Sequence, residues 1–445
     1  MSTDRGGQDQ GTVGRNSMRV LASQIAGNSG YFAAVLLLAR ALGPAERGTV
    51  AFITVTALVT SQAANLGVAD ATSVMAARSP ELRPALLANI TLLALAGSAI
   101  VGASTAVVLE FLPGVRPAGI GTGALVILAV ACTVTAATVA GYGYLRGCGH
   151  FGAYSRVQAT APWMYAACLG IAQATVGLTV VRAAVIWTVV QALSGARLLL
   201  AAGSLSGWVR PDLRLLVASI RFGSRAWVGS LSRLLNARTD QIITGLIATE
   251  ATLGIYAVAV NASEVLYYLP GAAAAALLPA VAGNPDAGTE RTLRVFRSVL
   301  LLTTFACLLG AIAGPLALPL VFGHAYRGAV GPFLILIPSA IGFATMNVFT
   351  GSTLGSLAPG RSSIGPLVAL ITQTTLDFIL IPSLHASGAA IAATTALLAG
   401  GIVALAVYRS RFPFPWRALL PGTSDLRLLG RLARRLLRGP AVAAP

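Results

Sequence analysis

The chain has 445 residues, of which 56% are hydrophobic and only 10% are charged. Soluble domains usually carry about 25% charged residues, so this composition excludes an ordinary soluble protein. The net charge of +17 comes from 31 arginines without a single lysine, and most of them lie between apolar runs or near the C-terminus. This distribution is typical of an oriented membrane protein and argues against a nucleic-acid-binding protein, whose positive charge gathers into one patch.

Long uncharged stretches predict membrane-spanning helices. Residues 84–109, 120–145, 157–181, 298–322 and 386–408 contain no Asp, Glu, Lys or Arg, and about 20 apolar residues suffice to cross a bilayer. Clusters of Pro and Gly separate these and the remaining apolar runs, as expected where helices end. We therefore expect an all-α polytopic membrane protein. Its twelve helices are predicted at 17–40, 46–77, 83–110, 120–145, 152–178, 183–206, 222–248, 251–281, 293–320, 329–357, 362–383 and 387–410.

The arginines predict the orientation of these helices. With the N-terminus in the cytoplasm, 24 arginines fall on the inner side and only 5 on the outer side. Cytoplasmic loops carry an excess of positive charge in membrane proteins. Twelve spans return the C-terminus to the cytoplasm, so we expect a multi-pass protein of the cell membrane with both termini inside.

The segments between and around the helices complete the predicted organisation. Five arginines between 427 and 438 share one face of a helix, opposite several leucines. The tail is therefore expected to be either an interfacial amphipathic helix on anionic lipids or a disordered basic segment. The predicted parts are a disordered N-terminus at 1–16, a six-helix bundle at 17–206, a cytoplasmic linker at 207–221, a second six-helix bundle at 222–410 and a basic tail at 411–445.

The two halves of the chain repeat one another. "LARALGPAERGTVAFI" at 38–53 and "GLIATEATLGIYAVAV" at 245–260 align with an offset near 206, which places Gly48 on Gly254. Each half holds six predicted helices, and an even number makes the two repeats parallel. Parallel repeats of six helices around a central cavity are typical of transporters, although a channel or a membrane enzyme can also be duplicated.

Several stretches resemble one family. "LARALGPAERGTVAF" is similar to the first hairpin of the Wzx-type polysaccharide flippases of the multidrug/oligosaccharidyl-lipid/polysaccharide exporter superfamily. Further similar stretches are "RTDQIITGLIATEATLGIYAVA" at 238–259, "LPLVFGHAYRGAV" at 318–330 and "IPSLHASGAAIAAT" at 381–394. The resemblance implies an alternating-access exporter that flips an undecaprenyl-pyrophosphate-linked oligosaccharide outward. Its implied partners are this lipid-linked oligosaccharide and other membrane proteins of polysaccharide assembly.

Polar residues inside two predicted helices mark a candidate binding cavity. Ionisable groups within membrane spans are costly and point to function. One polar stripe lies on the helix at 222–248 and covers about 100° of its circumference, and a milder one lies on the first helix. The two helices are expected to line opposite walls of the cavity. The candidate substrate-binding residues are Arg225, Arg233, Asn236 and Asp240 in the first stripe and Gln24, Asn28 and Tyr31 in the second.

Arg233 lies near the middle of its predicted helix. Its guanidinium could bind a pyrophosphate through two parallel hydrogen bonds. If the following hairpin turns near Thr249, Glu264 lies at the same depth, and a structural ion pair between Arg233 and Glu264 is the alternative. Asp240 could instead cap the helix or pair with Arg238.

Other carboxylates within spans are Asp70 and Asp377. Together with Glu264 they are either structural groups or the carriers of a coupling proton or sodium ion. The four cysteines lie far apart and the three histidines fall in separate loops, so we expect no metal site and no cofactor.

Two other functions stay open. A drug or small-molecule exporter of the same superfamily has the same helical plan, although the sequence lacks a convincing match to the multidrug and toxin extrusion branch. A membrane glycosyltransferase or polymerase acting on polyprenyl sugars should have a large extramembrane loop with clustered carboxylates. The longest internal polar connection, around 207–221, is short and basic, so we expect a transporter and not an enzyme.

Overall fold

A computed structural model describes residues 5–111, 120–268, 270–271, 288–355, 359–420 and 422, and these residues form helices and connections without a β-strand. The chain divides into two compact units. Unit 1 comprises Met1–Val258 and Val321–Tyr326, and unit 2 comprises Ala259–Leu320 and Arg327–Pro445.

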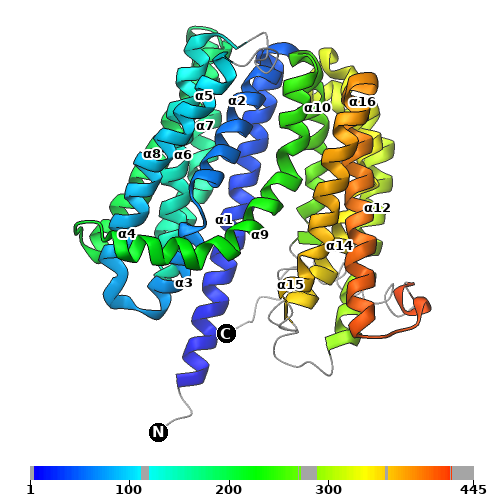
Figure 1. The fold of residues 1–445 in the computed structure, drawn as a ribbon. Helices are drawn as coiled ribbons and strands as arrows, with labels where there is room; N and C mark the ends of the chain where they lie inside the picture. Colours follow the sequence, from blue (N-terminus) through cyan, green and yellow to red (C-terminus); the bar gives the residue numbers. More distant parts are fainter. Residues whose placement is uncertain are drawn as a thin grey trace, which may run out of the picture. The chain divides into compact units, whose positions relative to one another are not determined.

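The helices follow the expected order (Figure 1). Unit 1 contains α1 (Arg5–Ala41), α2 (Pro44–Ala64), α3 (Val68–Arg78), η1 (Pro80–Leu82), α4 (Arg83–Leu92), the π-helical η2 (Leu93–Gly97), α5 (Ser98–Phe111), α6 (Thr122–Gly147), α7 (Phe151–Thr175), α8 (Val180–Ser206), α9 (Leu213–Ile247) and most of α10 (Glu250–Glu264). Unit 2 contains η3 (Val265–Tyr267), nearly all of α12 (Gly288–Phe322), half of η4 (His324–Ala329), α13 (Val330–Leu336), α14 (Ser339–Gly355), α15 (Pro359–Ser362), α16 (Ile364–Arg411) and η5 (Trp416–Leu419).

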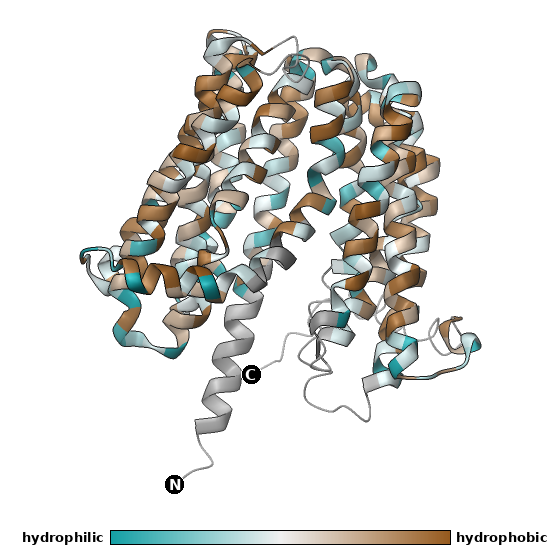
Figure 2. Ribbon diagram, viewed as in Figure 1, coloured by the Kyte–Doolittle hydropathy of each residue, from teal (hydrophilic) through white to brown (hydrophobic). Residues whose placement is uncertain are grey.

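Many of these helices have the length and composition of membrane spans. Five described segments can each cross a bilayer, and two bent helix pairs can each cross as one broken span. Large apolar side chains lie on the surface of the spans, such as Ile100, which is 69% exposed, and Leu316, which is 80% exposed. Brown apolar segments run along the helices of both units in Figure 2. Such surfaces are stable against lipid, and the prediction of an all-α polytopic membrane protein is confirmed.

The second predicted span, at 46–77, is two helices in the structure. α2 and α3 meet at an angle of 53°. Leu66 and Gly67 have positive φ angles of 49° and 75°, a conformation that costs glycine little. The Asn65 side chain accepts a hydrogen bond of 2.8 Å from the Ala69 amide, which provides an acceptor for one donor freed by the break.

The bend brings α9 against the backbone of α3. A Cβ atom on Gly67 would lie 2.3 Å from the Gly223 carbonyl oxygen, and one on Gly223 would lie 2.2 Å from the Gly67 carbonyl oxygen. The Trp227 indole also donates a hydrogen bond of 3.1 Å to the Gln62 carbonyl. The absence of a side chain at both glycines permits this close crossing of α3 and α9.

Two helices begin earlier than expected. Residues 213–221, which the sequence analysis places in the linker, are the first part of α9. The Asp212 carboxylate caps this helix by accepting hydrogen bonds from the Arg214 and Leu215 amides, and the Asn89 amide holds the Asp212 backbone through two hydrogen bonds of 2.9 Å. Helix α1 begins at Arg5, within the stretch 1–16 that was expected to be disordered. Extending an existing helix costs far less than nucleating one.

Small residues set the packing inside each unit. In unit 1, Gly141 of α6 lies against Leu198 of α8, where an added Cβ would come within 2.5 Å of the Leu198 Cβ. In unit 2, Gly342 of α14 faces the backbone of Leu397 in α16, where an added Cβ would lie 2.5 Å from the Leu397 carbonyl carbon. α16 covers both of the last predicted spans, and its backbone breaks at His385 (φ 52°, ψ −129°) between them. The predicted hairpin therefore turns where the sequence places it.

The repeat reappears as a reciprocal contact within unit 1. A Cβ on Gly48 would lie 1.8 Å from the Glu250 carbonyl oxygen, and a Cβ on Gly254 would lie 1.8 Å from the Pro44 carbonyl oxygen. Gly48 and Gly254 are 206 positions apart, and so are Pro44 and Glu250. The first turns of α2 and α10 therefore make the same contact with each other. Such a self-complementary contact is the property of a twofold axis, here one that relates two copies of a repeated hairpin.

Candidate functional site

Helix α1 presents a polar face that other parts of unit 1 leave open. Gln24 is exposed, Asn28 is half-buried and Tyr31 is 43% exposed. The adjacent face carries Gly27 and Gly30, where an added Cβ would lie within 3 Å of residues 158 and 163 in α7. Helix α7 packs against this glycine face and leaves Gln24 and Tyr31 exposed and Asn28 half-exposed, so these side chains can contact a polar ligand.

The polar stripe on α9 is described in part. Asn236 is half-buried and Asp240 is 5% exposed. Arg225 and Arg233 belong to the helix, but their side chains lie outside the described residues. Glu264 is half-buried at the end of α10. Contact of Arg233 with a substrate, or with Glu264, therefore stays a prediction.

Asp240 lies inside the α9–α10 hairpin. Its Oδ2 atom accepts a hydrogen bond of 2.5 Å from the hydroxyl of Tyr256, which is completely buried, and its Oδ1 atom accepts one of 2.8 Å from the Gln241 amide. The two residues flank the turn at Thr249 at similar distances along the chain, so they share one depth. The carboxylate thus links the two helices of the hairpin.

Asp240→Ala is expected to destabilise the protein by about 2 kcal/mol, because it leaves the buried Tyr256 hydroxyl without this acceptor. Tyr256→Phe, which keeps the packing of the ring, should cost about 1 kcal/mol. Thermal unfolding of the purified protein in detergent measures both. The matched control is Asp70→Asn at a half-exposed ion pair, for which a change near zero is expected. Equal stability of Asp240→Ala and the wild type would contradict the assignment.

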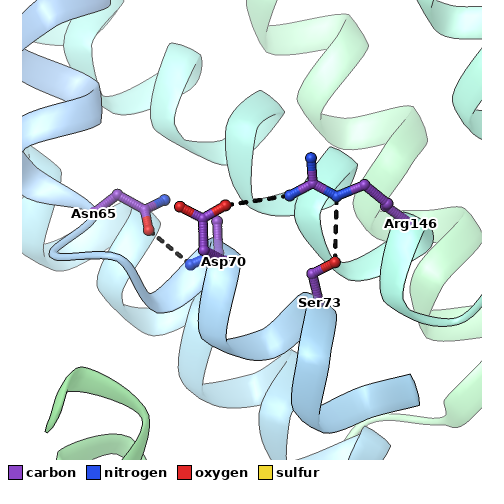
Figure 3. A network of polar contacts seen from close by, with 5 residues as sticks. Asn65, Asp70, Ser73 and Arg146 are labelled. Carbon is purple, nitrogen blue, oxygen red and sulfur yellow. Dashed lines mark hydrogen bonds and ion pairs between the residues drawn. The ribbon is translucent and has the colours of Figure 1, made fainter. Parts of the chain in front are cut away.

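Asp70 takes part in a network between α3 and α6 (Figure 3). Its Oδ1 atom lies 3.3 Å from Nη2 of Arg146, and the Arg146 Nε donates to the Ser73 hydroxyl at 3.2 Å. The two charged side chains are 31% and 49% exposed. A half-exposed ion pair of this kind contributes little to stability, typically about 0–1 kcal/mol.

Asp377 has a different environment. It is completely buried on the face of α16 that also carries Gln373, which is 1% exposed, one turn earlier. The same face continues in both directions with Ala369 and Ile381, each fully buried. The two remaining carboxylate candidates thus lie in separate units, one at a half-exposed end of α3 and one deep within α16.

Arg47 is a buried residue that was not among the predicted site residues. The sequence places it at the outer end of the helix predicted at 46–77, and in the structure it lies in the first turn of α2 and is only 4% exposed. Its Nε atom and the Tyr165 hydroxyl are both buried and have no hydrogen-bond partner among the described residues. The guanidinium interacts electrostatically with Tyr165 and Tyr326. In the sequence, this burial is indicated by the neighbouring Gly48, which allows the first turn of α2 to make the reciprocal contact with α10.

A buried arginine with an unused donor atom favours an anionic ligand. Removing a guanidinium from water costs several kcal/mol unless an anion or further hydrogen bonds compensate it. Cysteines do not supply an alternative chemistry here, because Cys132 and Cys307 are buried in apolar surroundings and Cys148 and Cys168 lie on different elements. Among the described residues, no three His, Cys, Asp or Glu side chains gather as a metal site.

The fold is that of a known class of membrane transporters. It is similar to the lipid II flippase MurJ in an inward closed conformation, with a TM-score of 0.71, 12% identity and coverage of 96% of this chain and 93% of that one. It is also similar to an inward-facing multidrug resistance MATE family transporter, with a TM-score of 0.69, 16% identity and coverage of 86% and 94%. A transporter of the same superfamily from Pyrococcus furiosus Vc1 follows with a TM-score of 0.56, 17% identity and coverage of 89% and 95%.

The family follows from the sequence. Residues 37–331 match the model of the family described as "Polysaccharide biosynthesis protein". The chain therefore belongs to this polysaccharide biosynthesis protein family, within the multidrug/oligosaccharidyl-lipid/polysaccharide exporter superfamily, and the predicted superfamily is confirmed. No curated protein matches the sequence. The matched region contains Arg47, Asp240 and Tyr256.

Proposed function

We propose that the protein flips a polyprenyl-pyrophosphate-linked oligosaccharide from the cytoplasmic to the outer leaflet of the cell membrane, for cell-surface polysaccharide biosynthesis. The observation that carries this proposal is the family match over residues 37–331, on a fold similar to that of a lipid II flippase. The lipid-linked sugar crosses the membrane unchanged by alternating access, so the protein is a transporter and not an enzyme.

The charges of the candidate site support an anionic substrate. The helix α9 carries Arg225, Arg233 and Arg238, and Arg47 lies buried in the same unit. Guanidinium groups bind phosphate oxygens in pairs of parallel hydrogen bonds. The open face of α1 offers amides and a phenol, which suit sugar hydroxyls. In this proposal arginines hold the pyrophosphate, and Gln24, Asn28 and Tyr31 contact the first sugars.

Orientation and coupling belong to the same proposal. Both termini lie in the cytoplasm, which the arginine distribution supports. A proton or sodium gradient drives the cycle through one of the carboxylates Glu264, Asp70 and Asp377. The basic stretch of the tail at 427–438 lies outside the described residues, and its binding to anionic lipids stays a prediction.

A second candidate is a cation-coupled exporter of drugs or other small molecules. The similarity to the MATE family transporter favours it. The buried Arg47 argues against cationic drugs, because a fixed positive charge repels them in a region of low dielectric constant.

Reconstitution into liposomes tests the proposal. The substrate is an undecaprenyl-pyrophosphate oligosaccharide with a fluorophore on its sugar, and a membrane-impermeant reductant quenches only the outer leaflet. The wild-type protein should make the inner-leaflet fraction accessible, whereas empty liposomes should not. Ethidium transport in the same vesicles tests the second candidate. Ethidium transport without flipping of the lipid-linked sugar would overturn the proposal.

Arginine variants connect this assay to the site. Arg233→Ala should abolish flipping if the guanidinium meets the pyrophosphate, and Arg233→Lys, which keeps only the charge, should restore part of it. The control is Arg327→Ala at an exposed arginine of η4, which should flip at the wild-type rate. Unimpaired flipping in both Arg233 variants would remove this residue from the mechanism.

A further inference from the structure

A pocket outside the candidate site opens at one end of unit 1. The connection between α3 and α4, the turn between α6 and α7 and the last turn of α8 meet there. The pocket has a volume of about 300 Å³, enough for a small polar group. Its walls are formed by Pro80, Arg83, Pro84, Cys148, His150, Leu205 and Ser206.

Hydrogen bonds hold the walls of this Arg83 pocket together. Tyr144, which is completely buried in α6, donates a hydrogen bond of 2.5 Å to the Ser206 hydroxyl oxygen and lies 3.2 Å from the Arg83 carbonyl oxygen. The Ser206 hydroxyl itself lines the pocket. The turn after α6 has Gly149 at a φ of 71°, and the His150 amide donates to the Leu145 carbonyl at 2.9 Å. The walls are therefore built into the fold.

Arg83 supplies the positive charge. Its Nε atom donates to the Ala76 carbonyl at 2.8 Å, so the two terminal amino groups are the donors that remain for a ligand. The guanidinium acts electrostatically on the Cys148 thiol, which also lines the pocket. No carboxylate is among the lining residues, and His150 lies on the same wall. Arginine, histidine and serine donors without an acidic group select an anion.

Large apolar side chains are exposed in the segment that follows the pocket. Leu205 is 47% exposed, Trp208 in the following connection is 52% exposed, and Leu213 at the start of α9 is 65% exposed. The Trp208 ring packs on Gly203, where an added Cβ would lie 2.2 Å from the indole nitrogen. Tryptophan beside exposed aliphatic residues is typical of the membrane interface. A free phosphate would leave this surface in water, whereas lipid chains would cover it.

We propose that the Arg83 pocket binds the phosphate group of an anionic phospholipid of the leaflet on its side, which the arginine distribution makes the cytoplasmic one. Arg83 meets the phosphate oxygens with its two terminal amino groups, and Ser206 and His150 contribute further donors. The acyl chains extend past Leu205 and Leu213. Basic pockets between helices on the cytoplasmic side suit anionic headgroups. The bound lipid joins three connections of unit 1 and so stabilises it.

Alkylation of Cys148 reports on occupancy, because this thiol lines the pocket. Burial raises the pKa of the Cys148 thiol above its ordinary value, so labelling of the purified full chain is carried out at one fixed alkaline pH. Mass spectrometry follows Cys148, with Cys168 as the internal reference. Phosphatidylglycerol at ten times its Kd should slow alkylation of Cys148 about tenfold and raise the melting temperature, whereas phosphatidylcholine and inorganic phosphate should do neither.

Variants separate binding from folding. Arg83→Gln should lose the protection, Arg83→Lys should keep part of it through its charge, and Arg78→Gln, at an exposed arginine outside the pocket, should keep all of it. Equal protection by phosphatidylcholine would overturn the charge selectivity, and equal protection by inorganic phosphate would overturn the lipid assignment. If no probe protects Cys148 from alkylation, or if Cys148 stays fully protected in Arg83→Gln, the proposed binding site is wrong.

Discussion

Gly48→Ala is expected to destabilise unit 1 by about 3 kcal/mol. The new Cβ would lie 1.8 Å from the Glu250 carbonyl oxygen and 2.9 Å from the Gly254 amide nitrogen. Both are backbone atoms, so the first turns of α2 and α10 have to separate, and neither can yield as a flexible side chain would. Gly254→Ala meets the Pro44 carbonyl at the same distance and should cost about as much.

Thermal unfolding and limited proteolysis of the purified protein measure this effect. Gly43→Ala is the matched control, because no heavy atom lies within 4 Å of an added Cβ at this neighbouring position, and its stability should change by about 0.5 kcal/mol or less. The double variant Gly48→Ala/Gly254→Ala should cost clearly less than the sum of the single variants, since one separation of the helices relieves both clashes. Additive costs would show that the two glycines do not share one contact.

Arg47→Met is expected to stabilise the protein by about 1–3 kcal/mol and to reduce flipping severely. Replacing a poorly compensated buried charge by an apolar side chain of similar size removes its desolvation cost. The Nε atom of Arg47 lacks a hydrogen bond among the described residues while the side chain is 4% exposed. A buried charged group that lowers the stability of the fold is expected to be kept where the function depends on its charge.

The melting temperature and the liposome flipping assay test the two parts of this prediction separately. Arg327→Met, at an exposed arginine, should leave both nearly unchanged. A loss of several kcal/mol in Arg47→Met would mean that the fold already compensates the guanidinium. A stabilised variant with normal flipping would mean that transport does not use Arg47.

Part of the candidate site could be predicted from the sequence, and the reasons lie in individual residues. The spacing of Gln24, Asn28 and Tyr31 already places them on one helix face, because helical periodicity is local. The hydrogen bond of Asp240 with Tyr256 was not predicted, because only Arg238, which is near in sequence, was considered as its partner. Tyr256 lies across the turn, and a hairpin brings it to the depth of Asp240, so counting outward from Thr249 would have found it.

Several features were settled by the sequence alone. The membrane class, the all-helical fold, the order of the spans and the repeat follow from the length of apolar runs, from Pro and Gly at their ends and from the offset between Gly48 and Gly254. These signals are local or repeat at a fixed interval. A helix in lipid must satisfy its own backbone hydrogen bonds, so its existence depends little on its neighbours.

Other features required the tertiary structure. The bend at Leu66 and Gly67, the burial of Arg47 and the Arg83 pocket all depend on which helix packs against which. A glycine in the sequence does not reveal whether another backbone lies against it, and an arginine beside a turn does not reveal whether a neighbouring helix covers it. Burial and close approach are properties of pairs of distant segments, and for this reason only the packed fold decides where the charges of this protein lie.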